Sequence, residues 1–90
     1  MKMFIIERKV PGAGNMTAEE LQALSNTSVA VVTLLGKPYT WVQSFVTEDK
    51  IFCIHKAENE DAIREHSKCA NFPINAIEEI KAVIDPSCAG

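Results

Sequence analysis

Hydrophobic residues occupy both faces of a predicted β-hairpin in the middle of the chain. Residues 41–56 consist of two runs rich in β-branched and aromatic residues, and the charged pair Glu48-Asp49 separates them. A two-residue turn at this pair places Ser44 opposite Cys53. One face then carries Val42, Ser44, Val46, Ile51, Cys53 and His55, and the other carries Trp41, Gln43, Phe45, Phe52, Ile54 and Lys56. Neither face is polar, so the pattern predicts a hairpin that is covered on both sides.

A further strand is predicted at the start of the chain. Residues 2–10 contain three consecutive apolar residues, Phe4 to Ile6, which is typical of a central strand covered on both faces. Glu7 and Arg8 follow and point to opposite faces, because neighbouring side chains alternate along a strand. Residues 11–15 include two glycines and a proline, and this composition indicates a loop.

A long helix is predicted between this loop and the hairpin. Thr17 and Glu20 have the spacing of a capping box, and apolar residues recur at helical intervals as far as Leu35. Gly36 then suits the left-handed residue that ends a helix. The β-branched run 29–35 is also compatible with a strand. We expect helix throughout, because the start and stop signals are both present.

A second helix and a last strand follow the hairpin. Asn59 is a suitable N-cap, and the helix is expected to run to about Ala70 with Asn71 as its left-handed end. Its predicted apolar stripe consists of Ala62, Ile63, His66, Cys69 and Ala70. Residues 77–84 are predicted to form a bulged strand, and residues 86–90 a short tail.

The predicted order is β-α-β-β-α-β in one α+β domain that spans residues 1–90. This is the ferredoxin-like arrangement, with antiparallel strand order 4-1-3-2 and both helices on one face of the sheet. The other face is left bare, and the hairpin indicates that it is apolar. We therefore expect a homodimer in which two sheets pack face to face, as in dimeric α/β barrel assemblies.

Composition limits the classes of partner. The formal net charge is −3 without a Lys/Arg run, which argues against nucleic-acid binding, and no apolar stretch is long enough to span a membrane. The three cysteines have no Cys-x-x-Cys spacing, so a zinc ribbon and a disulfide framework are not expected. We expect free thiols in a reducing cytoplasm, with Cys53 and Cys69 buried and Cys88 in the tail.

Several segments resemble one family of small bacterial proteins. They are Phe4-Ile-Ile-Glu-Arg8, Met16-Thr-Ala-Glu-Glu-Leu21, Trp41-x-x-Ser44-x-Val46-Thr47-x-Asp49-Lys50-x-x-Cys53, Ile63-Arg-Glu-His66, Phe72-Pro73 and Ile84-Asp-Pro86. The family is usually labelled a domain of unknown function, and one member is described as a nickel-binding, nickel-responsive protein. The resemblance implies a ferredoxin-like homodimer that binds a divalent metal. The chain departs from the family pattern at His55, where an aromatic residue is common, and at Glu58, where proline is common.

The resemblance makes His66 the first candidate ligand for nickel or zinc, followed by Glu7 and His55. Imidazole nitrogens and carboxylate oxygens are suitable ligands for both ions. The competing interpretation of His66 is a core histidine that is hydrogen-bonded to a backbone carbonyl. Glu7 is equally compatible with an ion pair to a neighbouring side chain.

Four residues are candidates for binding a cofactor or small ligand: Arg8, Trp41, Ser44 and Lys50. Trp41 and Ser44, together with Cys53, are expected to line a pocket between the sheet and a partner copy, although packed interface residues would have the same pattern. The alternative to a metal-binding protein is a cofactor-free monooxygenase or isomerase that uses a pocket on the sheet. This alternative rests on fold analogy alone, and the sequence identifies no catalytic residue.

Overall fold

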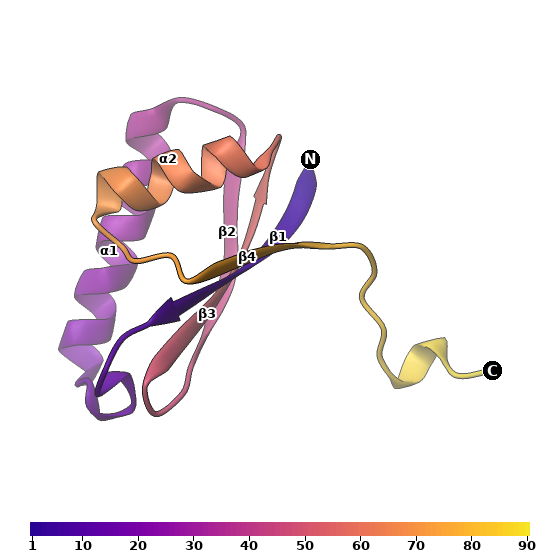
Figure 1. Cartoon of the computed structure of the whole chain (residues 1–90), viewed down its shortest axis with the longest axis horizontal. Helices are drawn as coiled ribbons and strands as arrows, with labels where there is room; N and C mark the ends of the chain where they lie inside the picture. Colours follow the sequence, from indigo (N-terminus) through magenta and orange to yellow (C-terminus); the bar gives the residue numbers. More distant parts are fainter.

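The protein forms one four-stranded antiparallel sheet with the strand order β2-β3-β1-β4 (Figure 1). The computed structural model describes all residues 1–90. The strands are β1 (Lys2–Lys9), β2 (Tyr39–Val46), β3 (Lys50–Ala57) and β4 (Ala76–Ile80). The helices are α1 (Ala18–Leu35) and α2 (Glu60–Ala70), with short 3-10 turns at Ala13–Asn15 and Pro86–Cys88. The predicted α+β, ferredoxin-like arrangement and its strand order are confirmed.

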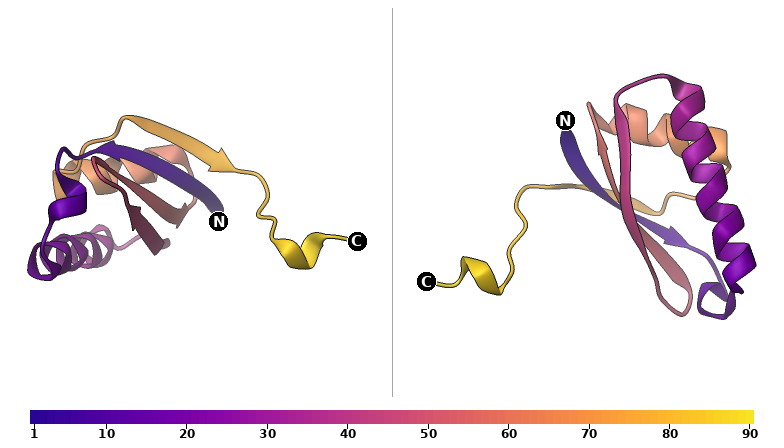
Figure 2. Two further views of the ribbon diagram at one scale, coloured as in Figure 1. Left: turned by 90° about the horizontal axis from the view of Figure 1, so that it is seen from below. Right: turned by 180° about the vertical axis from the view of Figure 1, so that it is seen from behind.

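Both helices lie on the same face of the sheet, and no part of the chain covers the opposite face (Figure 2). The hydrophobic core lies between the helices and the sheet and consists of Phe4, Ile6, Ala13, Tyr39, Ile51, Cys53, Ala57, Ala62 and Ile63. Neither helix is long and apolar enough to cross a membrane.

The capping signals determine where α1 begins and ends. Thr17 Oγ1 accepts a hydrogen bond from the Glu20 amide at 3.1 Å, and Glu20 Oε1 accepts one from the Thr17 amide at 3.0 Å. This reciprocal pair satisfies two amides that the helix itself leaves free. Gly36 ends the helix with φ 62°, in the left-handed region that glycine adopts without strain. The segment 29–35 is therefore helical, as predicted.

The buried face of α2 differs from the predicted stripe at one position. Ala62, Ile63, His66 and Ala70 are buried as expected, but Cys69 is exposed and Ser67 takes its place. The prediction for Cys69 was wrong because the helix is rotated toward Ser67, whose hydroxyl accepts a hydrogen bond from Arg8 of β1.

A β-bulge in β2 changes the predicted composition of the two sheet faces. Near the turn the register is as predicted, with Ser44 opposite Cys53. Farther from the turn than Ser44, Gln43 opposes Ile54 and Trp41 opposes His55, so Val42 is an extra residue in the strand. Because the side-chain period of a strand is two, one inserted residue moves all earlier residues to the other face. Trp41 therefore lies on the helix side, and its predicted place on the opposite face was wrong.

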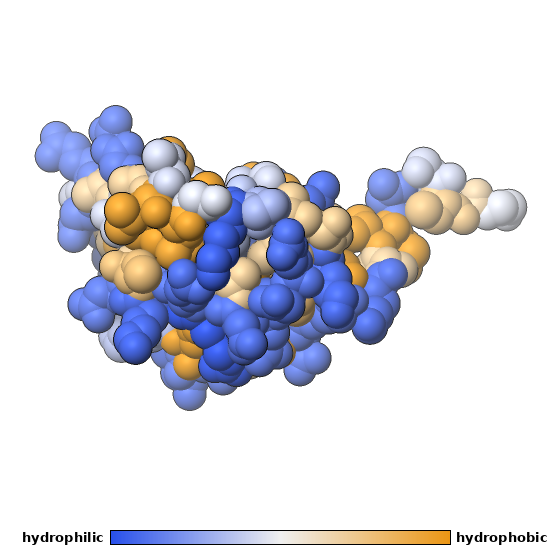
Figure 3. All heavy atoms as spheres, turned by 90° about the horizontal axis from the view of Figure 1, so that it is seen from above, coloured by the Kyte–Doolittle hydropathy of each residue, from blue (hydrophilic) through white to orange (hydrophobic).

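The last strand is shorter than the predicted 77–84. Ile80 is its final residue and pairs with Met3, which leaves only Lys2 of β1 available for further pairing. The following segment, 81–90, extends away from the domain (Figure 1), and hydrophobic side chains lie along it (Figure 3). Val83 and Ile84 in this segment are 69% and 83% exposed.

Candidate functional site

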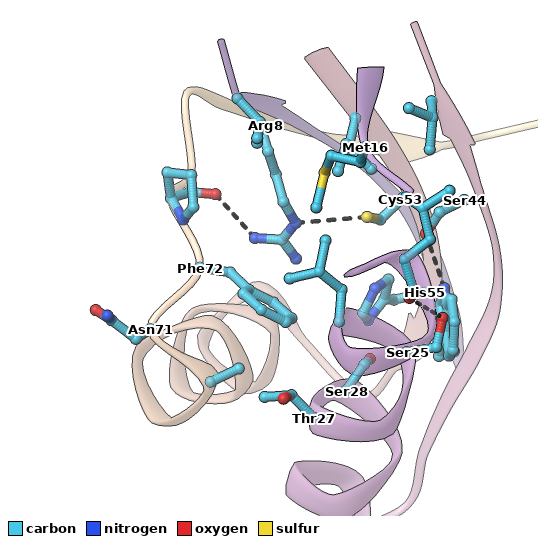
Figure 4. A pocket seen from close by; sticks show the side chains of 18 residues that line it. Arg8, Met16, Ser25, Thr27, Ser28, Ser44, Cys53, His55, Asn71 and Phe72 are labelled. Atoms are coloured by element: carbon cyan, nitrogen blue, oxygen red, sulfur yellow. Dashed lines mark hydrogen bonds between the residues drawn. The ribbon is translucent and has the colours of Figure 1, made fainter. Parts of the chain in front are cut away.

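A pocket of about 510 Å³ lies between the sheet, α1 and the loop that joins α2 to β4 (Figure 4). Its lining is mainly apolar, and α1 contributes Leu21 and Leu24. Polar groups reach it from all three strands that form its floor: Arg8 from β1, Ser44 from β2 and His55 from β3. A concave, mostly apolar cavity of this size with a few polar side chains is typical of a small-molecule site.

Arg8 is the only charged residue that lines the pocket, and it is buried with an exposed fraction of 3%. Its Nη1 donates to Ser67 Oγ at 3.0 Å and to the Pro73 carbonyl at 2.9 Å, and its Nε donates to Cys53 Sγ at 3.4 Å. The guanidinium carbon lies 5.4 Å from the centre of the Phe72 ring. None of the four ion pairs in the protein involves Arg8, and its Nη2 has no hydrogen-bond partner.

Beside the pocket, three rings form a buried cluster. The hydroxyl of Tyr39 and Nδ1 of His55 share a hydrogen bond of 2.6 Å, and the His66 ring stacks on Tyr39 with centroids 4.9 Å apart. His66 Nε2 donates to the Ser28 carbonyl at 3.2 Å, so its Nδ1 carries the lone pair in the neutral ring. His55 Nε2 and His66 Nδ1 are buried and have no partner.

The two histidines are neutral near pH 7. Burial lowers the pKa of His55 from 6.5 to about 3, and the neighbouring His66 and Arg8 contribute in the same direction. Burial also lowers the pKa of His66, although its hydrogen bond to Ser28 opposes the shift. Burial raises the pKa of Tyr39, so its hydroxyl keeps its proton. Arg8 is therefore the one fixed charge in this region.

Three of the four predicted ligand-binding residues line the pocket, and the fourth does not. Arg8, Trp41 and Ser44 are part of the lining, where Trp41 Nε1 donates to Ser44 Oγ at 2.9 Å. Lys50 points from the opposite face, where its Nζ lies 3.3 Å from Glu7 Oε1. The pocket also lies under the chain's own helices, whereas the sequence suggested a pocket between the sheet and a partner copy.

The three predicted metal ligands do not converge in one chain. His55 and His66 are neighbours, with ring centroids 5.2 Å apart, but Glu7 lies on the uncovered face of the sheet. No group of three His, Cys, Asp or Glu side chains is placed to hold a metal ion. The two free imidazole nitrogens are suitable donors, yet a transition-metal site commonly needs three or more protein ligands. The residues of a single chain therefore do not form a complete site.

Sequence reasoning missed three residues that shape the site. Tyr39 was left outside the predicted hairpin, although it begins an aromatic and β-branched run directly after Pro38. Ser67 follows His66 and was not part of the predicted apolar stripe. Phe72 covers Arg8 from a loop, and no periodic pattern extends into that loop.

Comparison with known proteins gives one family and one fold match. A family model described as "Nickel responsive protein SCO4226-like" matches residues 4–80. The crystal structure of SCO4226 from Streptomyces coelicolor A3(2) is similar, with a TM-score of 0.78 and 15% sequence identity. The match covers 91% of this chain and 99% of that one. No curated protein matches the sequence. The chain belongs to the nickel-responsive SCO4226-like family.

Proposed function

We propose that the chain is a small-molecule-binding protein whose site is the pocket between α1, the α2–β4 loop and the sheet. One observation carries this proposal: an apolar cavity of about 510 Å³ into which polar side chains of three strands project. We propose binding rather than nucleophilic catalysis, because Cys53 Sγ is hydrogen-bonded to Arg8 and not to a histidine that could act as its base.

Fluorescence of the neutral apolar probe N-phenyl-1-naphthylamine tests this proposal. Ser25 lines the pocket from α1, and Thr33 is an exposed residue of the same helix. Ser25→Trp should fill part of the cavity and weaken probe binding, whereas the matched control Thr33→Trp should leave it unchanged. The proposal fails if the wild-type protein shows no saturable binding, or if the two variants bind the probe equally well.

Nickel binding is a second proposal, and membership of the nickel-responsive family favours it. The candidate ligands are His66 and His55 on the helix side of the sheet and Glu7 on the bare side, with zinc as the competing ion. Because one chain does not bring three donors together, a complete set needs water or donors from a second copy. Neutral imidazole is the form that binds metal, and burial keeps both histidines neutral near pH 7.

Calorimetric titration with nickel chloride and zinc chloride can locate the ion, because the candidate ligands lie on opposite faces of the sheet. Loss of binding in His55→Gln alone would place it beside the pocket, and loss in Glu7→Gln alone would place it on the bare face. Absence of heat above the buffer signal in the wild type would contradict metal binding.

We further propose that the protein is a cytoplasmic homodimer joined through the bare sheet face. Ile5, Phe52 and Ile54 lie on this face, and the segment 81–90 carries two exposed hydrophobic residues that a second copy could cover. The three unpaired cysteines support a reducing compartment.

Sedimentation velocity at micromolar concentration tests the dimer. Ile54→Lys should give a folded monomer because it places a charge in the proposed interface. Leu34→Lys is the matched control, since Leu34 is an exposed residue of α1 on the other side of the molecule. A monomeric wild type would refute the proposal.

A further inference from the structure

The pocket contains one positive charge and no negative one. Its 18 lining residues include Arg8 but no aspartate, glutamate or lysine, and the lining histidine is neutral. Arg8 is nevertheless 3% exposed, so water cannot solvate its charge as it does at the surface. A buried charge without a partner is costly, and folded proteins normally pair it with an opposite charge. The missing countercharge has to come from outside the chain.

The orientation of Arg8 shows where this countercharge would lie. Two of its three nitrogens are hydrogen-bonded to the protein, Nη1 to Ser67 and Pro73 and Nε to Cys53. The remaining nitrogen, Nη2, is buried without a partner and points into the pocket (Figure 4). The bound nitrogens fix the guanidinium, so the two N–H groups of Nη2 are the ones without an acceptor, and a ligand in the cavity reaches them once the side chains that cover Nη2 shift.

The rest of the cavity restricts the chemical class of that acceptor. A phosphate normally requires several cations or a row of free backbone amides. Arg8 is the only cation here, and neither Ala18 nor Glu19, whose amides the capping box leaves free at the start of α1, lines the pocket. Leu21, Leu24 and other apolar side chains form most of the remaining wall, which suits an apolar body.

We propose that the pocket binds a monocarboxylic acid with an apolar body, and that its carboxylate accepts hydrogen bonds from Arg8 Nη2. This inference rests on the proposed small-molecule-binding function and adds the class of ligand. Arg8 is then the residue that selects an acid over a neutral molecule of the same shape. The apolar wall provides binding that does not depend on charge.

Isothermal titration calorimetry of the full chain with octanoate, octanamide and octyl phosphate tests the class of ligand. Octanoate should bind roughly 10- to 100-fold more tightly than octanamide, as expected when a charged hydrogen bond is made in a buried site. Arg8→Met should reduce octanoate affinity to the level of octanamide. Lys9→Met should leave it unchanged, because Lys9 is the adjacent residue of β1 but is exposed on the opposite face.

The other outcomes separate this inference from the proposal on which it rests. Equal binding of octanoate and octanamide, weakened by Ser25→Trp, would keep the pocket as a binding site but overturn the carboxylate. Tighter binding of octyl phosphate than of octanoate would also overturn it. Absence of binding by all three would overturn both proposals. The comparison of octanoate with octanamide uses the wild-type protein, so it tests the preference for a carboxylate even if Arg8→Met fails to fold.

Discussion

The buried histidine His55 should make the protein lose stability as the pH falls below neutral. Its pKa is about 3 in the folded protein and near 6.5 in the unfolded chain, so the unfolded chain takes up the proton first. The stability that depends on the neutral ring is complete above pH 6.5 and is lost progressively between pH 6.5 and pH 3. Each pH unit in this window lowers the free energy of unfolding by about 1.4 kcal/mol.

From pH 6.5 to pH 4.5, His55 alone therefore removes about 2–3 kcal/mol of stability. This is a substantial share of the roughly 5–15 kcal/mol that holds a typical domain folded. His66 acts in the same direction, because burial lowers its pKa too. Asp85 has a lowered pKa through its hydrogen bonds to Ser87, and its contribution also falls with pH, but it is fully exposed and lies in the tail.

Urea unfolding at pH 7.0, 5.5 and 4.5, followed by circular dichroism, measures the effect. The comparison is between the wild type and His55→Gln, which keeps a polar side chain opposite the Tyr39 hydroxyl but cannot be protonated. The variant should be less stable at pH 7 yet lose less stability on acidification. The contribution of Asp85 is the same in both proteins, so it cancels in the comparison. Parallel stability curves over the three pH values would refute the assignment of the acid response to His55.

Three further substitutions test the packing and the caps. Ile63→Ala removes a side chain with no exposed surface and should lower the free energy of unfolding by about 2–5 kcal/mol in urea titrations; a loss below about 1 kcal/mol would contradict its place in the core. Thr17→Ala removes the cap of α1 and should cost about 0.5–2 kcal/mol by the same measurement, whereas an unchanged midpoint would contradict the capping box. Gly14→Ala puts a methyl group 3.0 Å from the Glu48 Cα, so thermal unfolding should show a loss of about 1–3 kcal/mol, and a neutral effect would mean that the loop moves freely away from the hairpin.

The sequence predicted those parts of the fold that depend on local chemistry. Thr17, Gly36, Asn59 and Asn71 act on the backbone within one turn of their own position, and each lies where the helix boundaries required. The order of the strands followed from the order of the elements and the handedness of their connections.

Features that depend on distant partners were not predictable in the same way. β4 ends at Ile80 because its partner strand has almost no residue left, although Val83 and Ile84 continue the apolar pattern. Ser67 is buried in place of Cys69 because α2 is rotated toward Arg8 of β1. Both outcomes depend on register between segments far apart in sequence, which hydrophobic spacing does not encode.

The same limit applies to the candidate site. Arg8, Trp41 and Ser44 were identified from the sequence and line the pocket, but Lys50 and Glu7 were grouped with residues that lie on the other side of the sheet. The alternation of side chains along β1 separates Glu7 from Arg8 and was foreseen. The location of the cavity was not, because it arises where two helices and a loop fail to close over three strands.

The bulge at Val42 makes the chemistry of the pocket depend on a residue that does not line it. If β2 ran without the bulge, Val42 would stand opposite His55, and both Trp41 and Tyr39 would turn toward the bare face. The Tyr39 hydroxyl would leave His55, and the indole would leave the cavity, without any change in the amino-acid sequence. Relatives that lack this one residue would keep both aromatic side chains on the helix side without a bulge, so alignments of the family should be read for a one-residue gap at this position before residues of β2 are assigned to a face.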